Sequence, residues 1–127
     1  MAKIIVKPKR EPPPRRVSLA GKIVAVDFDG TLCVSEWPEI GAPNVPLIDA
    51  LREAKANGAR LILWTCRTGE QLSAAVDWCR RFRLEFDAVN DNLPESKEAF
   101  GGDGRKIYAD VYLDDRAAAP EDVVCRK

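Results

Sequence analysis

Residues 22–32 of the chain read KIVAVDFDGTL, and this stretch decides the fold. Its first part, Ile23–Val26, is an uninterrupted apolar run with β-branched side chains, which is typical of a strand buried on both faces. The sequence then changes at once to aspartate, glycine and threonine, which favour a turn. We therefore predict a buried strand that ends in a polar loop beginning at Asp27.

Strand and helix patterns alternate along the rest of the chain. Short apolar runs predict three further strands, at Leu61–Trp64, Phe86–Val89 and Ile107–Leu113. Helical spacing and capping signals predict two helices, one over 45–57 that Gly58 caps and one that a Thr68–Gln71 capping box opens and that ends near Arg81. This alternation predicts an α/β fold, with a Rossmann-like parallel sheet and helices on both faces.

The start of the chain differs in composition from the rest. Residues 1–22 hold seven Lys and Arg side chains against one Glu, a net charge of +6, whereas the whole chain of 127 residues is neutral. Pro8 and Pro12–Pro14 favour polyproline II in this segment, although Ile4–Val6 could add an edge strand. We predict a basic, proline-rich arm at 1–20 and one folded domain at 21–127.

The composition excludes several kinds of site. The chain has no histidine, which removes Ser-His-Asp catalysis, Cys-His catalysis and histidine-based metal sites. Its four cysteines form no Cys-x-x-Cys pair, so we expect free thiols rather than a zinc site or a disulfide framework. We find no secretory signal and no apolar run long enough for a bilayer, so we expect a cytoplasmic protein without a membrane partner.

Polar residues stand beside the ends of the predicted strands. Asp27–Thr31 follow the first strand, Thr65–Thr68 follow the second and Asp114–Asp115 follow the last, while Lys106 comes just before that last strand. The carboxyl ends of parallel strands meet at one edge of a sheet, where α/β proteins bind ligands. We therefore expect these groups to form one site.

The residue types in this site suit phosphoryl transfer. One carboxylate can attack phosphorus and a second, two residues later, can move protons. Lysine and hydroxyl groups can hold the phosphoryl oxygens, and Gly30 lets backbone N–H groups approach them closely. Mg²⁺ would relieve the repulsion among clustered carboxylates, so we expect Mg²⁺ as the cofactor.

These residues carry a resemblance to a known family. Asp27-Phe28-Asp29-Gly30-Thr31-Leu32 resembles the first motif of the haloacid dehalogenase (HAD) superfamily. Later motifs of that family are matched in order by Thr65, Lys106 and Asp114–Asp115, so that the resemblance covers residues 22 to about 118. It implies a magnesium-dependent phosphomonoester hydrolase that forms an aspartyl-phosphate on Asp27 and uses Asp29 as general acid and base.

The expected roles of the site residues follow from this resemblance and from their places after the strands. The catalytic residues are Asp27, Asp29, Thr65 and Lys106. The phosphate-binding residues are Gly30, Thr31, Thr65, Cys66, Arg67 and Lys106. The metal ligands are Asp27, Asp29 through its backbone carbonyl, and the pair Asp114 and Asp115.

Several of these assignments have rivals. Lys97 competes with Lys106 as the phosphate-binding lysine, and either Asp114 or Asp115 could touch the metal directly. Asp110 is a further acidic candidate, because it would face the same side as Asp114 in an ideal strand.

Aromatic and basic side chains near the site also have two readings. We expect residues 35–41 to form a flap in which Trp37 stacks on a substrate ring or anchors the flap on the body. Arg67 could contact a phosphate or form a surface salt bridge. We expect Trp64 and Trp78 to lie in the core.

The resemblance also implies a member without a cap domain, because the loops after the first and third strands are short. Such members act on large or polymeric phosphorylated substrates, or borrow a lid from a partner subunit, so an oligomer is one expectation. Two rival functions compete with hydrolysis of a small phosphomonoester. One is a nucleic-acid end phosphatase whose basic arm grips the backbone, and the other is a catalytically inactive binding module on the same fold.

Overall fold

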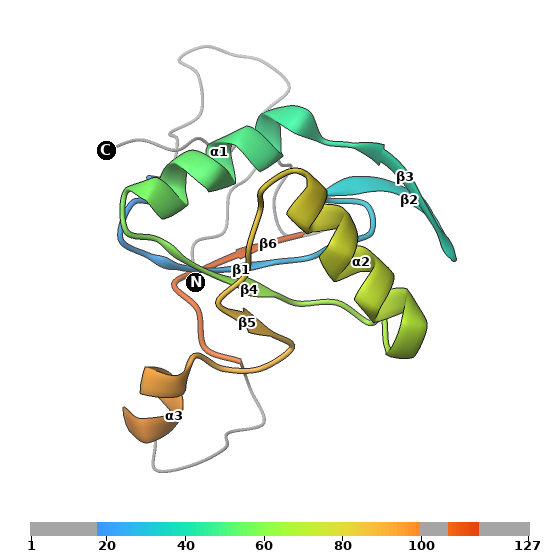
Figure 1. The fold of residues 1–127 in the computed structure, drawn as a ribbon. Helices are drawn as coiled ribbons and strands as arrows, with labels where there is room; N and C mark the ends of the chain where they lie inside the picture. Colours follow the sequence, from blue (N-terminus) through green and yellow to red (C-terminus); the bar gives the residue numbers. More distant parts are fainter. Residues whose placement is uncertain (1–17, 100–106, 115–127) are drawn as a thin grey trace, which may run out of the picture.

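A four-stranded parallel sheet forms the centre of the structure, a computed structural model that describes residues 18–99 and 107–114 (Figure 1). The strands lie in the order β5-β4-β1-β6, and every neighbouring pair is parallel. Their bounds are Ile23–Val26 for β1, Arg60–Leu63 for β4, Ala88–Val89 for β5 and Val111–Leu113 for β6. The α/β architecture predicted from the sequence is therefore confirmed, with a parallel sheet of the Rossmann-like kind.

Two helices, α1 (Val45–Ala56) and α2 (Gly69–Arg81), cover one face of this sheet. Side chains alternate along a strand, so every second strand residue faces these helices. The main core consists largely of Leu47, Ile48, Leu51, Ala54, Ala75, Trp78 and Cys79 from the helices against Val24, Val26, Leu61, Leu63, Val111 and Leu113 from the strands. Burying one such Leu, Ile or Val stabilises the fold by about 1.5–3 kcal/mol, so this face supplies most of the driving force.

The third helix, α3 (Pro94–Ala99), lies on the opposite side of the sheet in Figure 1. The core on that side is smaller, and its buried members are Ala25, Ile62, Leu93 and Ala109. Helices therefore occur on both faces, as predicted. None of the helices in the described ranges has both the length and the apolar content needed to cross a membrane.

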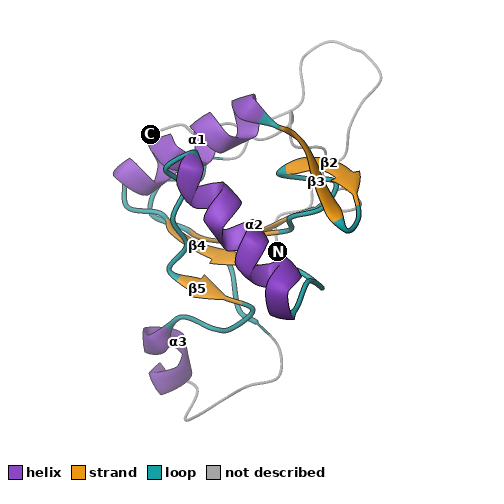
Figure 2. Cartoon of the chain, turned by 45° about the vertical axis from the view of Figure 1, so that its right-hand side comes forward, coloured by secondary structure: helices purple, strands orange, loops and turns teal. Residues whose placement is uncertain are grey.

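An antiparallel hairpin follows β1 in the chain and leads to α1. Its strands are β2 (Cys33–Glu36) and β3 (Glu39–Pro43), and it stands apart from the sheet (Figure 2). We call residues 33–43 the flap, which the sequence placed at 35–41. Asn44 closes its base, since its N–H donates to the Leu32 carbonyl at 2.8 Å and its side-chain amide donates to the Thr31 carbonyl at 3.1 Å. The Asn44 side chain also accepts from the Leu47 N–H at 3.3 Å and thereby caps α1.

The two outer strands are shorter than predicted, because aspartate side chains replace ladder hydrogen bonds at their beginnings. Before β6, the Asp110 carboxylate accepts from the Ile23 N–H at 2.8 Å while the Asp110 N–H donates to the Ile23 carbonyl at 2.7 Å. Before β5, Asp87 forms the same reciprocal pair with Leu61, at 2.8 Å and 2.7 Å. Residues predicted as strand therefore lie outside the ladder at these two places.

Other sequence predictions changed in detail. Leu19 is fully buried in the main core, so the folded body reaches back into the predicted arm, of which residues 1–17 lie outside the described residues. The prediction that Trp64 lies in the core was wrong, because this side chain is 38% exposed and meets Tyr112 edge to face. Trp78 is buried as predicted. Thr68 is the N-cap of α2 as predicted. Its side chain makes no capping hydrogen bond within the described residues, however, so the predicted capping box is not formed there.

Candidate active site

The strand order reverses at β1, and two predicted acidic residues lie at this reversal. The chain leads from β1 to β4 on one side, whereas β6 lies on the other side of β1. Asp27 follows β1 and Asp114 follows β6, and the two strands end in register because Val26 pairs with Leu113. The Asp27 N–H donates to the Leu113 carbonyl at 2.9 Å, which fixes this arrangement. Open α/β sheets bind their ligands at such a reversal.

The segment after β4 lies on the other side of Asp27 and is held by Asn90. The Trp64 N–H donates to the Val26 carbonyl at 2.9 Å, which continues the ladder beyond β4. The Thr65 N–H donates to the Asn90 side-chain oxygen at 2.8 Å. Asn90 has a φ of 51°, in the left-handed region that asparagine tolerates. The structure thus brings the chain positions of Asp27, Thr65 and Asp114 to one edge of the sheet.

The sequence did not predict the part played by Asn90. Its N–H donates to the carbonyl of Leu63, the last residue of β4, at 2.7 Å, and its side chain accepts from the N–H of Thr65. Asn90 is thus bound to the residues on either side of Trp64. The available signal was an asparagine directly after a predicted strand, a residue type that favours left-handed turns.

The loop after β1 is built on backbone hydrogen bonds. The Phe28 carbonyl accepts from the Thr31 N–H at 3.2 Å and from the Leu32 N–H at 2.9 Å. Gly30 has a φ of 84°, which favours glycine at this position of the turn. The Asp27 carboxylate accepts from the Phe28 N–H at 2.9 Å, which orients it at the start of the loop.

Arg67 occupies a position that the sequence did not predict. Its side chain is 1% exposed, whereas the sequence offered a phosphate contact or a surface salt bridge. Its Nε and Nη2 donate to the two carboxylate oxygens of Asp29 at 2.9 Å and 2.8 Å, a bidentate pair. Its Nη1 and Nη2 also donate to the Pro38 and Glu39 carbonyls at 3.2 Å and 3.0 Å. Arg67 therefore forms a buried salt bridge that joins Asp29 to the flap.

Trp37 anchors the flap on the same guanidinium. The Arg67 Cζ atom lies 4.9 Å from the Trp37 ring centroid, which is within the range of a cation–π contact. The Trp37 side chain is nevertheless 60% exposed, so much of its ring faces outward. The structure thus shows the anchoring contact, and stacking on a substrate stays a prediction.

Burial and the ion pair set the charges in this region. The hydrogen bond to Asp29 raises the pKa of Arg67 above its ordinary value, while burial acts in the opposite direction. Burial is the main cause that raises the pKa of the Cys33 thiol, and the negative charge of Asp29 adds to it. Arg67 is therefore a cation and Cys33 a neutral thiol at neutral pH, which makes Cys33 a poor nucleophile. Cys66 is exposed next to Thr65.

Thr31 was predicted to bind phosphate, but its side chain is only 2% exposed. Its hydroxyl oxygen is buried and has no hydrogen-bond partner within the residues that the structure describes. Its backbone carbonyl, in contrast, accepts the hydrogen bond from Asn44.

The rival candidates lie away from Asp27 or outside the described residues. The Lys97 Nζ atom lies 2.7 Å from an Asp91 oxygen, beyond the end of β5 and two strands from β1. This hydrogen bond lowers the pKa of Asp91. The inclusion of Asp110 among the site candidates was wrong, because Asp110 binds Ile23 at the opposite edge of the sheet. Lys106 and Asp115 fall outside the described residues, so their roles stay predictions.

The oxygen atoms at this edge have the chemistry that Mg²⁺ prefers. Asp27 and Asp114 are carboxylates at the ends of adjacent strands. Asp29 would contribute its backbone carbonyl, since Arg67 binds both of its carboxylate oxygens. Among residues 18–99 and 107–114, no three His, Cys, Asp or Glu side chains are grouped to hold a metal. Mg²⁺ requires only one or two carboxylates together with phosphate and water, so the donors present fit it.

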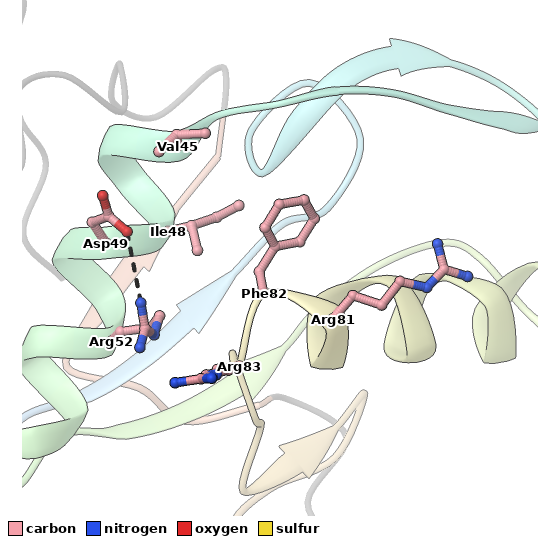
Figure 3. A pocket seen from close by; sticks show the side chains of 7 residues that line it. All are labelled: Val45, Ile48, Asp49, Arg52, Arg81, Phe82 and Arg83. Atoms are coloured by element: carbon pink, nitrogen blue, oxygen red, sulfur yellow. Dashed lines mark ion pairs between the residues drawn. The ribbon is translucent and has the colours of Figure 1, made fainter.

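A separate pocket of about 260 Å³ lies between α1 and the end of α2 (Figure 3). It is lined by Val45, Ile48, Asp49, Arg52, Arg81, Phe82 and Arg83. Arg52 is 3.9 Å from Asp49, and Figure 3 shows the Arg83 side chain directed toward α1. The described lining contains none of the residues that follow the strands, so the pocket is not part of the candidate active site.

Comparison with known proteins finds a relative among the solved structures. A solved structure of a conserved protein coded by a locus of Bacteroides thetaiotaomicron is 41% identical to the chain, with a TM-score of 0.68. The similarity covers 76% of this chain and 77% of that one. No protein-family model and no curated protein matches the chain. That relative is described only as conserved, so the comparison bears on fold and ancestry. With this identity over three quarters of both chains, the chain belongs to the family of the conserved Bacteroides thetaiotaomicron protein.

Proposed function

We propose that the protein is a magnesium-dependent phosphomonoester hydrolase of the HAD type, with Asp27 as its nucleophile. The position of Asp27 between the ends of β4 and β6, at the reversal of strand order, supports this most. The segment that carries the Thr65 hydroxyl follows β4 on one side of Asp27. The segment that carries the Asp114 carboxylate follows β6 on the other side. Such a set can attack phosphorus and stabilise the charge that develops on its oxygens.

The proposed reaction has two steps. An Asp27 oxygen attacks phosphorus, the bond to the leaving oxygen breaks, and the protonated form of Asp29 gives that oxygen its proton. Water then attacks the phosphorus of the aspartyl-phosphate, loses a proton to Asp29, and inorganic phosphate leaves with Asp27 regenerated. Mg²⁺, when bound, neutralises the carboxylates and the phosphoryl oxygens.

The other site residues hold the phosphoryl group in this proposal. The Thr65 hydroxyl and the Lys106 ammonium donate to its oxygens. The Gly30 N–H, predicted to bind phosphate, instead donates to the Cys33 carbonyl at 2.9 Å. Asp29 can still exchange protons while Arg67 holds it, because each carboxylate oxygen has more than one lone pair and the side chain is 24% exposed.

The proposal includes an open site without a cap domain. Between β1 and α1 the chain forms only the short flap, which is much smaller than a domain. An open site of this kind suits a phosphate group at the end of a polymer as well as one on a small molecule.

A panel of phosphomonoesters and phosphorylated oligonucleotides, assayed with Mg²⁺ and with EDTA, tests the proposal. We expect the wild type to release phosphate only with Mg²⁺ and Asp27→Asn to lose essentially all turnover while unfolding at a similar temperature. Asp77→Asn is the matched control. Asp77 lies exposed on α2, where it forms a surface ion pair with Arg80 at 3.7 Å. We also expect acid quenching to trap a phosphoryl group on Asp27. Near-normal turnover by Asp27→Asn, or no magnesium-dependent hydrolysis of any ester, would contradict the proposal.

A further inference from the structure

The buried guanidinium of Arg67 lies where the loop after β1, the segment after β4 and the flap meet. We propose that Arg67 is a positioning residue that fixes the Asp29 carboxylate and the closed flap together, so that neither moves without the other. The kinetic consequences of this inference rest on the proposed function. The coupling itself can be measured without turnover.

The side-chain hydrogen bonds of Arg67 are divided equally between the two elements that it joins. Two bonds go to the Asp29 carboxylate and two go to flap carbonyls, those of Pro38 and Glu39. A guanidinium can meet both because its donors point in fixed directions within one plane. Lysine carries its donors on a single nitrogen and cannot form the bidentate pair while reaching both carbonyls.

Aromatic rings from the same two elements lie against the guanidinium. Its Cζ atom is 5.1 Å from the Phe28 ring centroid and 4.9 Å from that of Trp37. Phe28 comes directly before Asp29 in the chain, and Trp37 lies at the turn of the flap. Each element therefore provides hydrogen-bond acceptors and one ring.

Burial makes these contacts depend on one another. A buried cation is tolerated only while it is paired and hydrogen-bonded. When the flap opens, Arg67 loses two carbonyl acceptors and the Trp37 ring at once. When Asp29 is replaced by asparagine, the buried cation keeps only neutral acceptors, which favours an open flap. The flap and Asp29 are thus coupled through Arg67.

In the proposed reaction this coupling affects the second step more than the first. A good leaving group such as p-nitrophenolate departs without a proton, so Asp27 is phosphorylated even when Asp29 is misplaced. Hydrolysis of the aspartyl-phosphate still requires Asp29 to take a proton from water. Loss of Arg67 should therefore make the aspartyl-phosphate accumulate.

Hydrolysis of p-nitrophenyl phosphate with Mg²⁺ tests the kinetic consequence. We expect kcat of Arg67→Gln and Arg67→Lys to fall about 100-fold, which is the usual effect of a misplacement near 1 Å. We also expect both variants to release a burst of p-nitrophenolate equal to the enzyme concentration, which the wild type lacks. A general loss of structure would remove the burst together with the turnover. Arg52→Gln is the control, because the ion pair that Arg52 forms with Asp49 on α1 is exposed.

Hydrogen exchange of the flap amides tests the coupling without substrate. We expect Asp29→Asn, Arg67→Gln and Trp37→Leu each to speed exchange in residues 33–42 by about tenfold, with β4 unchanged. If Arg67→Gln does not fold, flap hydrogen exchange in Asp29→Asn and Trp37→Leu still tests the coupling. Faster flap exchange in a protein that hydrolyses no phosphomonoester supports the coupling and refutes the proposed function. Unchanged flap exchange in Asp29→Asn, or a folded Arg67→Gln that turns over normally without a burst, overturns the inference.

Discussion

At the scale of single residues, the buried hydroxyl of Thr31 has an energetic consequence. It has no hydrogen-bond partner among the described residues, and a buried polar group in that state costs about 1–3 kcal/mol. We expect Thr31→Val to raise the free energy of unfolding by about 1 kcal/mol, measured by urea denaturation. If the protein has the proposed function and this hydroxyl binds phosphate, turnover should fall in the same variant that gains stability.

Thr68→Val is the matched control for this substitution. Thr68 is exposed, and its side chain makes no capping hydrogen bond to α2 within the described residues. Its replacement should therefore change stability by less than about 0.5 kcal/mol. A loss of stability in Thr31→Val would show that its hydroxyl has a partner after all.

Cys79 gives the fold a dependence on alkaline pH. Burial is the main cause that raises the pKa of its thiol from 9.0 to about 12. Above pH 9 the unfolded chain releases a proton that the folded chain keeps, so unfolding becomes easier. The stability from this thiol is complete below pH 9 and falls by about 1.4 kcal/mol per pH unit until the pH reaches the folded pKa.

Urea denaturation of the wild type and Cys79→Ala at pH 8 and pH 10 measures this effect. The variant should be less stable at pH 8, because it leaves a cavity in the main core. The difference between the two proteins should shrink by about 1.4 kcal/mol at pH 10, since only the wild type has this thiol to ionise. Other titrating groups are common to both proteins. An equal difference at both pH values would contradict the raised pKa.

At the scale of elements, the end of α2 places an arginine where glycine is usual. The Arg83 N–H donates to the Arg80 carbonyl at 2.9 Å and the Leu84 N–H donates to the Cys79 carbonyl at 3.0 Å, which is a Schellman motif. Arg83 has a φ of 59°, and the left-handed region costs a side chain roughly 1 kcal/mol. We therefore expect Arg83→Gly to raise the melting temperature, with a gain in stability of about 0.5–1 kcal/mol.

Arg81→Gly provides a control of opposite sign for this element. Arg81 is the last residue of α2 and has a helical backbone, where glycine costs about 1 kcal/mol. The two arginine-to-glycine substitutions remove the same charge from neighbouring exposed positions. If they shift the melting temperature in the same direction, backbone conformation is not the cause.

The elements also show what can be predicted from sequence. β1 and its loop were predictable because an apolar run followed by Asp-Phe-Asp-Gly-Thr specifies them locally. The beginnings of β5 and β6 were not, because Asp87 and Asp110 bind Leu61 and Ile23 across the sheet. The burial of Arg67 was not predictable either, since it depends on a partner 38 residues away and on flap carbonyls that any residue would provide.

At the scale of the whole molecule, the boundary between the arm and the body decides which truncation is tolerated. Leu19 is 0% exposed and belongs to the main core, although it lies within the first 20 residues. Because the sequence predicts an arm outside the folded domain at residues 1–16, their deletion should leave the free energy of unfolding nearly unchanged. Deletion of residues 1–20 should cost about 2–5 kcal/mol, as when a buried leucine is lost. Equal melting temperatures for the two truncated proteins would contradict this assignment.

The same shorter truncation tests whether the arm binds nucleic acid. Residues 1–16 carry six cationic side chains, Lys3, Lys7, Lys9, Arg10, Arg15 and Arg16. If they contact a nucleic-acid backbone, the truncated protein should bind a phosphorylated oligonucleotide more weakly and with less dependence on salt. Its hydrolysis of a small phosphomonoester should not change, because none of the proposed catalytic residues lies in the arm. Equal affinity of both proteins at two salt concentrations would rule out this role.

The closed base of the flap makes this segment a natural place for change during evolution. Asn44 ties the end of the hairpin back to Thr31 and Leu32, where it began, and caps α1 in the same place. The positions at which the chain leaves the loop after β1 and enters α1 are therefore fixed, whatever length of chain lies between them. Longer loops between fixed ends cost little additional entropy. Relatives can thus acquire longer or differently shaped segments between the same two ends without redesigning the fold beneath.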